Sequence, residues 1–61
     1  MDEVAYAQHI KRAKEADLIY NAIREIYGRE IPWKVAYFNA IKDKLLSKED
    51  KMIVKEVHPV R

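Results

Sequence analysis

Apolar residues recur every three to four positions through the first half of the chain, with polar residues between them. From Glu3 to Tyr27 there is neither glycine nor proline, and most residues favour helix. At about 100° per residue, one broad face collects Ala5, His9, Ala13, Ala16, Ile19, Tyr20, Ile23, Ile26 and Tyr27. The pattern predicts an amphipathic helix over residues 3–27, with Asp2 as its N-cap.

A turn and a second helix are predicted next. Gly28, the only glycine, suits the C-terminal cap because it adopts positive φ without a Cβ clash. Pro32 suits the first helical position, where its missing N–H costs nothing. Tyr37, Ile41 and Leu45 share one helical face, which predicts a helix from Trp33 to Leu46. The short connection predicts that the two helices are antiparallel neighbours.

The last part of the chain has the signal of a helix start. Ser47 and Asp50 have the spacing of a capping box, with Asp in place of the usual Glu. We therefore expect a third helix over residues 48–57, ended by Pro59. Its inner face would carry Ile53, Val54 and Val57.

The whole chain is predicted to form a single all-α domain over residues 1–61. Its architecture is a long N-terminal helix in an antiparallel helical hairpin, followed by a short third helix. A strand near Met52 is the alternative for the last element, because Ile53 and Val54 are β-branched and the segment is short.

The first two helices differ in length. At 1.5 Å per residue the first is about 37 Å long and the second about 21 Å. An overhang therefore stays uncovered, made up of Ala5, Tyr6, His9, Ile10 and Ala13. The third helix or a second copy of the chain would cover it, and a kinked or frayed N-terminus would remove it. We favour a homodimer, because 61 residues bury too little surface to be very stable alone.

Composition narrows the function classes. The chain has no cysteine, and 49% of its residues are hydrophobic and 36% charged, which is a globular balance. No apolar run approaches 18 residues, so we expect no membrane span. The start Met1-Asp2-Glu3 is acidic where a secretory signal is basic, and we expect a cytoplasmic protein. Residues 28–61 carry eight Lys/Arg against five Asp/Glu, a mild basic bias.

The residues offer little chemistry for catalysis. There is one serine, Ser47, at a predicted helix cap, and no Cys or Thr. A single glycine cannot build a phosphate-binding loop. Of the two histidines, His9 has no metal ligand at helical spacing around it, and His58 precedes Pro59 in a tail. We predict no enzyme activity, no cofactor, no metal and no small-molecule site.

Aromatic residues crowd the predicted turn and cannot all point inward. Trp and Tyr are frequent anchors of protein interfaces. We therefore predict a small, non-enzymatic protein–protein interaction module that self-associates through an aromatic and aliphatic helix face. The predicted partner-binding residues are Trp33, Tyr37 and Tyr27 at the turn, and Tyr6 and Ile10 on the overhang.

Nucleic acid is the alternative partner. Residues 19–41 can be interpreted as a helix-turn-helix of a small DNA-binding regulator, with the second helix as recognition helix. Only Asn39 there is suited to reading bases. The phosphate contacts would come from Lys34, Lys42, Lys44, Lys48, Lys51 and Lys55.

Overall fold

The chain folds into three helices. The computed structural model describes the backbone of residues 3–61 and the side chains from Tyr6 onward, so the predicted cap Asp2 and the inward position of Ala5 lie outside the described residues. The helices are α1 (Glu3–Tyr27), α2 (Trp33–Lys42) and α3 (Lys48–Val57). The all-α prediction is confirmed, and the last element is a helix rather than a strand.

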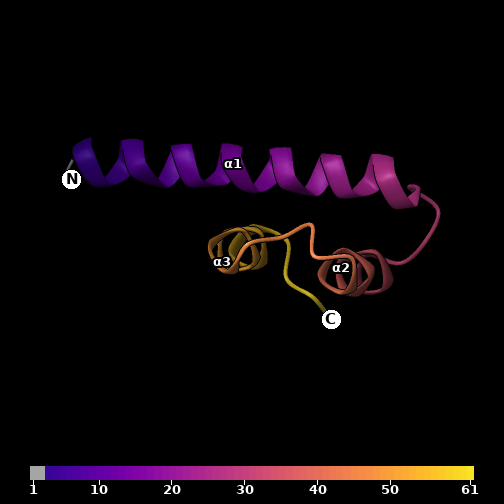
Figure 1. The fold of residues 1–61 in the computed structure, drawn as a ribbon. Helices are drawn as coiled ribbons and strands as arrows, with labels where there is room; N and C mark the ends of the chain where they lie inside the picture. Colours follow the sequence, from indigo (N-terminus) through magenta and orange to yellow (C-terminus); the bar gives the residue numbers. More distant parts are fainter. Residues whose placement is uncertain (1–2) are drawn as a thin grey trace.

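Both short helices pack on the same side of the long one. In Figure 1, α1 lies across the view, with α2 beneath its C-terminal part and α3 beneath its middle. The chain turns back onto α1 as predicted. Both short helices are drawn nearly end-on, so they pack across α1 rather than along it. The N-terminal end of α1 extends beyond both of them.

The core forms where these helices cross. Ile23 of α1 packs against Ala36 and Ala40 of α2, whose small side chains allow a close approach of the two backbones. Partly buried residues surround this cluster, namely Ile19, Tyr27, Ile31, Trp33 and Leu46. Ala16, near the middle of α1, and Ile53 and Val54 of α3 are also buried.

The turn after α1 begins at Gly28, as the sequence predicts. Gly28 has φ 95°, and its N–H bonds to the carbonyl of Arg24 at 2.8 Å. Pro32 is the N-cap and Trp33 the first helical residue, so the proline stands one position earlier than predicted. The Arg24 guanidinium donates to the carbonyl of Ile31, which fixes the turn against α1.

The end of α2 was predicted wrongly. The helix ends at Lys42 instead of Leu46, because Lys44 adopts φ 58° and reverses the backbone. The N–H of Lys44 bonds to the carbonyl of Ile41 at 3.0 Å, and that of Leu45 to Ala40 at 2.9 Å. These two bonds form a Schellman motif. Its usual glycine is absent, so the sequence carries no signal for this end.

The start of α3 agrees with the prediction. The Asp50 N–H bonds to Ser47 Oγ at 3.1 Å, and the Ser47 N–H to Asp50 Oδ2 at 3.3 Å, which completes the capping box. Ile53 and Val54 are buried as expected. The inward prediction for Val57 is wrong, because this last residue of α3 is 38% exposed, at the margin of the packed surface.

Candidate interaction surfaces

The aromatic residues at the turn belong largely to the fold. Tyr37, predicted to bind a partner, is only 4% exposed and is therefore a core residue. Trp33 is half-buried against the α1–α2 core, and its Nε1 donates to the carbonyl of His58 at 2.9 Å. Of the aromatic residues near the turn, Phe38 presents an exposed ring, at 52%.

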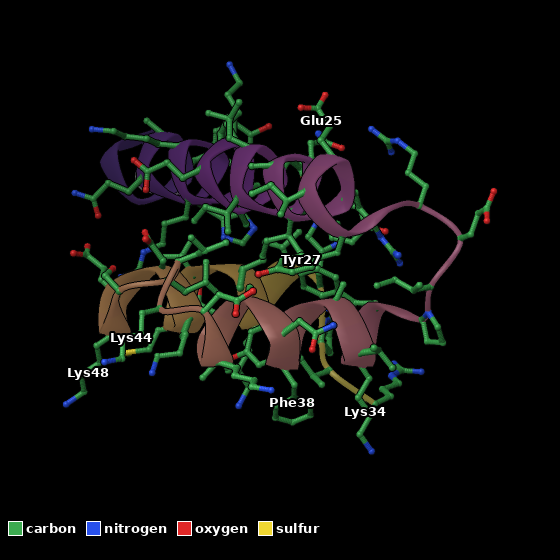
Figure 2. The ribbon with its side chains drawn as sticks, turned by 45° about the vertical axis from the view of Figure 1, so that its right-hand side comes forward. Glu25, Tyr27, Lys34, Phe38, Lys44 and Lys48 are labelled. Atoms are coloured by element: carbon green, nitrogen blue, oxygen red, sulfur yellow. The ribbon has the colours of Figure 1, made fainter. Side chains whose placement is uncertain are left out.

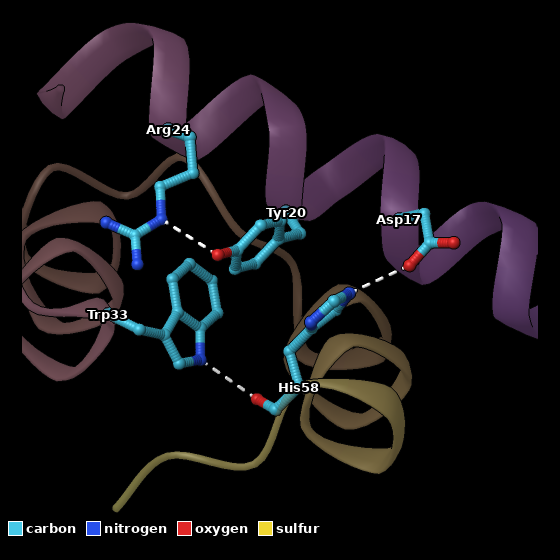
Figure 3. Close-up of polar contacts among 5 residues, drawn as sticks. All are labelled: Asp17, Tyr20, Arg24, Trp33 and His58. Atoms are coloured by element: carbon cyan, nitrogen blue, oxygen red, sulfur yellow. Dashed lines mark hydrogen bonds and ion pairs between the residues drawn. The ribbon is translucent and has the colours of Figure 1, made fainter. Parts of the chain in front are cut away.

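His58 joins all three helices through contacts that the sequence did not reveal. Its ring stacks on Tyr20 of α1, with centroids 4.0 Å apart, and its Nε2 lies 2.8 Å from Asp17 Oδ1 (Figure 3). Its carbonyl accepts the Trp33 bond from α2. His58 is separated from Asp17 by 41 positions in the sequence, so no local pattern could have paired them. We therefore assign this cluster a structural role.

Tyr27 also makes contacts within the fold. Its hydroxyl donates to Asp43 Oδ2 at 2.5 Å and lies 3.2 Å from the carbonyl of Asn39 (Figure 2). The hydrogen bond to Asp43, with smaller contributions from desolvation and from the Asp43 charge, raises the pKa of Tyr27 to about 12. The hydroxyl therefore links the last turn of α1 to the end of α2.

The predicted overhang is shorter than expected but present. α1 is continuous from Glu3 to Tyr27, so no kink removes the overhang. Arg12 reaches Glu56 of α3 at 3.3 Å, and Ala13 is half-buried. Tyr6 and Ile10 remain 58% and 38% exposed, respectively. α3 therefore covers the middle of α1 and leaves these two side chains accessible.

A second apolar surface, which sequence analysis missed, follows α1 on another face. We call Leu18, Ala22 and Ile26 the α1 ridge, because residues four apart form one row along a helix. Leu18 is 71% and Ile26 59% exposed, and Ala22 is exposed as well. The inward prediction for Ile26 is wrong, since the core uses a narrower stripe around Ile23. The i, i+4, i+8 spacing was a usable signal, although it was obscured by the neighbouring core positions.

An open groove runs beside the α1 ridge. Its volume is about 130 Å³, enough for one aliphatic side chain. Seven residues of α1, the α2–α3 connection and α3 line it, namely Ile19, Ala22, Ile23, Ile26, Leu45, Leu46 and Asp50. Leu45, at the rim, is 49% exposed because α2 ends early.

The outer side of α2 and α3 is rich in lysine. We call it the lysine surface, and Figure 2 shows Lys34, Lys44 and Lys48 on the side away from α1, together with Phe38. The other lysines of α2 and α3 are Lys42 and Lys55, which are exposed, and Lys51, which is half-buried. Among the side chains that the structure describes, none of these six lysines forms an ion pair.

Most carboxylates of this half of the chain are already engaged. Asp43 accepts from Tyr27, Asp50 caps α3, and Glu56 pairs with Arg12 of α1. Glu49 is the remaining carboxylate after Trp33. After Trp33 six lysines stand against four carboxylates, so this part of the chain has an excess of positive charge.

Other kinds of site are not found in the described part of the chain. Residues 3–61 contain no helix that is both long and apolar enough to cross a membrane. The described side chains also hold no group of three or more potential metal ligands. No protein-family model, no curated protein and no solved structure matches the chain.

Proposed function

We propose that the protein is a small, non-enzymatic interaction module that self-associates through the α1 ridge. The observation that carries this proposal is the exposure of Leu18 and Ile26, at 71% and 59%, on one row of α1 beside an apolar groove. Full burial of such a side chain stabilises by about 1.5–3 kcal/mol. A contiguous apolar row of this kind is a typical protein-binding surface.

The predicted turn residues have a different part in this proposal. Trp33, Tyr37 and Tyr27 are engaged in burial and hydrogen bonds within the fold, so they are not the centre of the proposed partner surface. Tyr6 and Ile10 are accessible as well, but at 3.6 residues per turn they lie on a different face of α1 from the ridge, so they form a separate apolar contact. The partner surface is therefore aliphatic at its centre rather than aromatic.

Solution mass tests the proposal. Sedimentation equilibrium of the wild-type chain from about 10 μM to 1 mM should show a monomer–dimer equilibrium. Leu18→Glu should weaken the dimer at least about tenfold, because a charge would replace an exposed apolar anchor. Met52→Glu is the matched control, since Met52 is 61% exposed on α3, and it should leave the equilibrium unchanged. A wild-type monomer throughout this range would refute the proposal.

Nucleic acid remains the second candidate, and the lysine surface is the observation that favours it. Lysines contact phosphates without reading bases, so binding would be weakly sequence-specific. The helix-turn-helix interpretation over residues 19–41 pairs the end of α1 with α2. In Figure 1 α2 is seen nearly end-on beneath α1, so these two helices cross at a large angle, as the helices of that motif do. Random duplex DNA should bind at low salt, and affinity should fall steeply as salt rises. No binding at low salt would exclude this candidate.

A further inference from the structure

We infer that the outer side of α2 binds single-stranded nucleic acid by stacking one base on Phe38 between two lysines. We call Lys34, Phe38 and Lys42 the α2 row, because residues four apart form one row along a helix. All three are exposed, and Figure 2 shows Lys34 and Phe38 on the side of α2 away from α1. This inference deepens the second candidate function and does not depend on self-association through the α1 ridge.

Phe38 presents an aromatic surface that the fold leaves accessible. Its ring packs edge-to-face with the buried ring of Tyr37, with centroids 5.6 Å apart and planes at 71°. Such a contact uses at most one face of the Phe38 ring and helps to hold the ring in place. A base can stack on the remaining face, and stacking on aromatic side chains is a main source of affinity for single strands.

The two lysines of the α2 row are placed to contact phosphates on either side of that base. Lys34 and Lys42 are separated by about 12 Å along the helix axis, with Phe38 midway between them. At about 3.4 Å per nucleotide of a stacked strand, this distance spans roughly three to four nucleotides. Neither lysine forms an ion pair with another described side chain. The α2 row therefore combines an aromatic platform with flanking cations, as nonspecific single-strand binding requires.

The charge of α2 favours an anionic occupant. The helix contains two lysines and no carboxylate. The carboxylates that flank it are Glu30, in the preceding turn, and Asp43, which accepts from Tyr27. Lys34 lies in the first turn, where the helix dipole disfavours a cation, so its charge does not serve the stability of the helix. A second copy of the α2 row would bring like charges together, which disfavours a symmetric contact between copies here.

A single strand fits the α2 row better than a duplex or a membrane. In a duplex the bases stack on one another, while an unpaired base can turn out onto an aromatic ring. Reading a duplex needs side chains that hydrogen-bond to base edges, and Asn39, the residue of α2 suited to this, is half-buried. Membrane binding needs a broad apolar face, whereas the exposed large apolar residues of α2 are Val35 and Phe38.

Fluorescence anisotropy at low salt tests the stacking, with labelled oligothymidylate of about 20 nucleotides and a random duplex of equal length as probes. Phe38→Leu should weaken single-strand binding at least about fivefold and leave duplex binding unchanged, because leucine is apolar but has no ring face. Phe38→Trp should retain single-strand binding. Met52→Ala is the matched control, since Met52 is an exposed apolar residue of α3 with Lys48 and Lys55 beside it but no ring.

The salt dependence of the same binding tests the lysines. Each phosphate contact on a single strand contributes about 0.7 to the slope of log K against log salt concentration, so the double variant Lys34→Gln/Lys42→Gln should lower this slope by about 1.4. Lys11→Gln/Lys14→Gln removes the same charge from exposed positions of α1 and should leave the slope unchanged. Circular dichroism of each variant checks that the helices are intact.

Three results would overturn this inference. The first is an equal effect of Phe38→Leu and Met52→Ala on single-strand binding, and the second is an equal slope for the two lysine double variants. The third is no single-strand binding at low salt, and binding to vesicles of equal parts phosphatidylcholine and phosphatidylserine would then assign the α2 row to a membrane surface. Duplex binding in any of these cases would leave the second candidate function standing, and sedimentation tests the α1 ridge separately.

Discussion

Lys44 holds the end of α2 in a conformation that most side chains avoid. Its φ of 58° lies in the left-handed region, where the Cβ of an L-residue approaches the following carbonyl oxygen. The Schellman bonds from Lys44 and Leu45 require this backbone conformation. Replacing Lys44 by Gly should therefore stabilise the fold by removing the steric cost.

The magnitude follows from two opposing effects. The left-handed conformation costs about 1–2 kcal/mol for a residue with a Cβ. Glycine loses more backbone freedom on folding, which offsets about 0.5–1 kcal/mol of that gain. The Lys44 side chain is exposed, so its removal should change little else. We expect Lys44→Gly to raise the free energy of unfolding by about 0.5–1 kcal/mol, or Tm by several degrees.

Urea and thermal unfolding followed by far-UV circular dichroism would measure this change. Wild type and variant must be compared at the same protein concentration, because self-association shifts the apparent stability. Lys42→Gly is the control, since Lys42 is the last helical residue of α2 and glycine there should destabilise by up to about 1 kcal/mol. A Lys44→Gly variant that is less stable than wild type would refute the assigned backbone conformation.

Two further predictions concern the contacts that join α1 to the rest of the fold. The folded-state pKa of Tyr27, about 12, lies above its ordinary value of 10.0, so its contribution to stability is complete below pH 10 and is lost as the pH rises from about 10 to 12. The wild-type advantage over Tyr27→Phe, measured by urea unfolding, should shrink across this interval, and a constant difference would contradict the Asp43 contact. Trp33→Phe removes the hydrogen bond to His58 and part of the core packing, and should lower the free energy of unfolding by about 1–3 kcal/mol. Tyr6→Phe, at an exposed site, is the control in the same unfolding assay, and equal stabilities of the two variants would count against the His58 contact.

Local signals in the sequence were sufficient for most of the secondary structure. Three signals each act within a few residues. They are the absence of glycine and proline up to Tyr27, the single glycine after it and the Ser47–Asp50 pair. The structure has α1 and α3 where these signals predict them. The end of α2 had no such signal, because a lysine occupies the position where glycine is usual.

The candidate surfaces depended on contacts between distant residues. The predicted turn aromatics are engaged in the fold: Tyr37 is buried, and Trp33 bonds to the carbonyl of His58, 25 positions away. Ile26 is exposed because α2 and α3 cross α1 and bury only a narrow stripe around Ile23. Tyr6 and Ile10 were placed correctly on the exposed overhang, because the length of a helix follows directly from its sequence limits.

Local residue patterns specify the helical class, the turn at Gly28 and the capped start of α3, because backbone preference and hydrogen bonding act over four or five residues. The tertiary structure decided which face of each helix is buried, and hence which apolar residues are free to bind. That choice depends on the angle at which helices cross and on the side chains that meet there. Residues far apart in the sequence determine both the crossing angle and the contacting side chains. Helical periodicity, which is a local pattern, therefore cannot predict them.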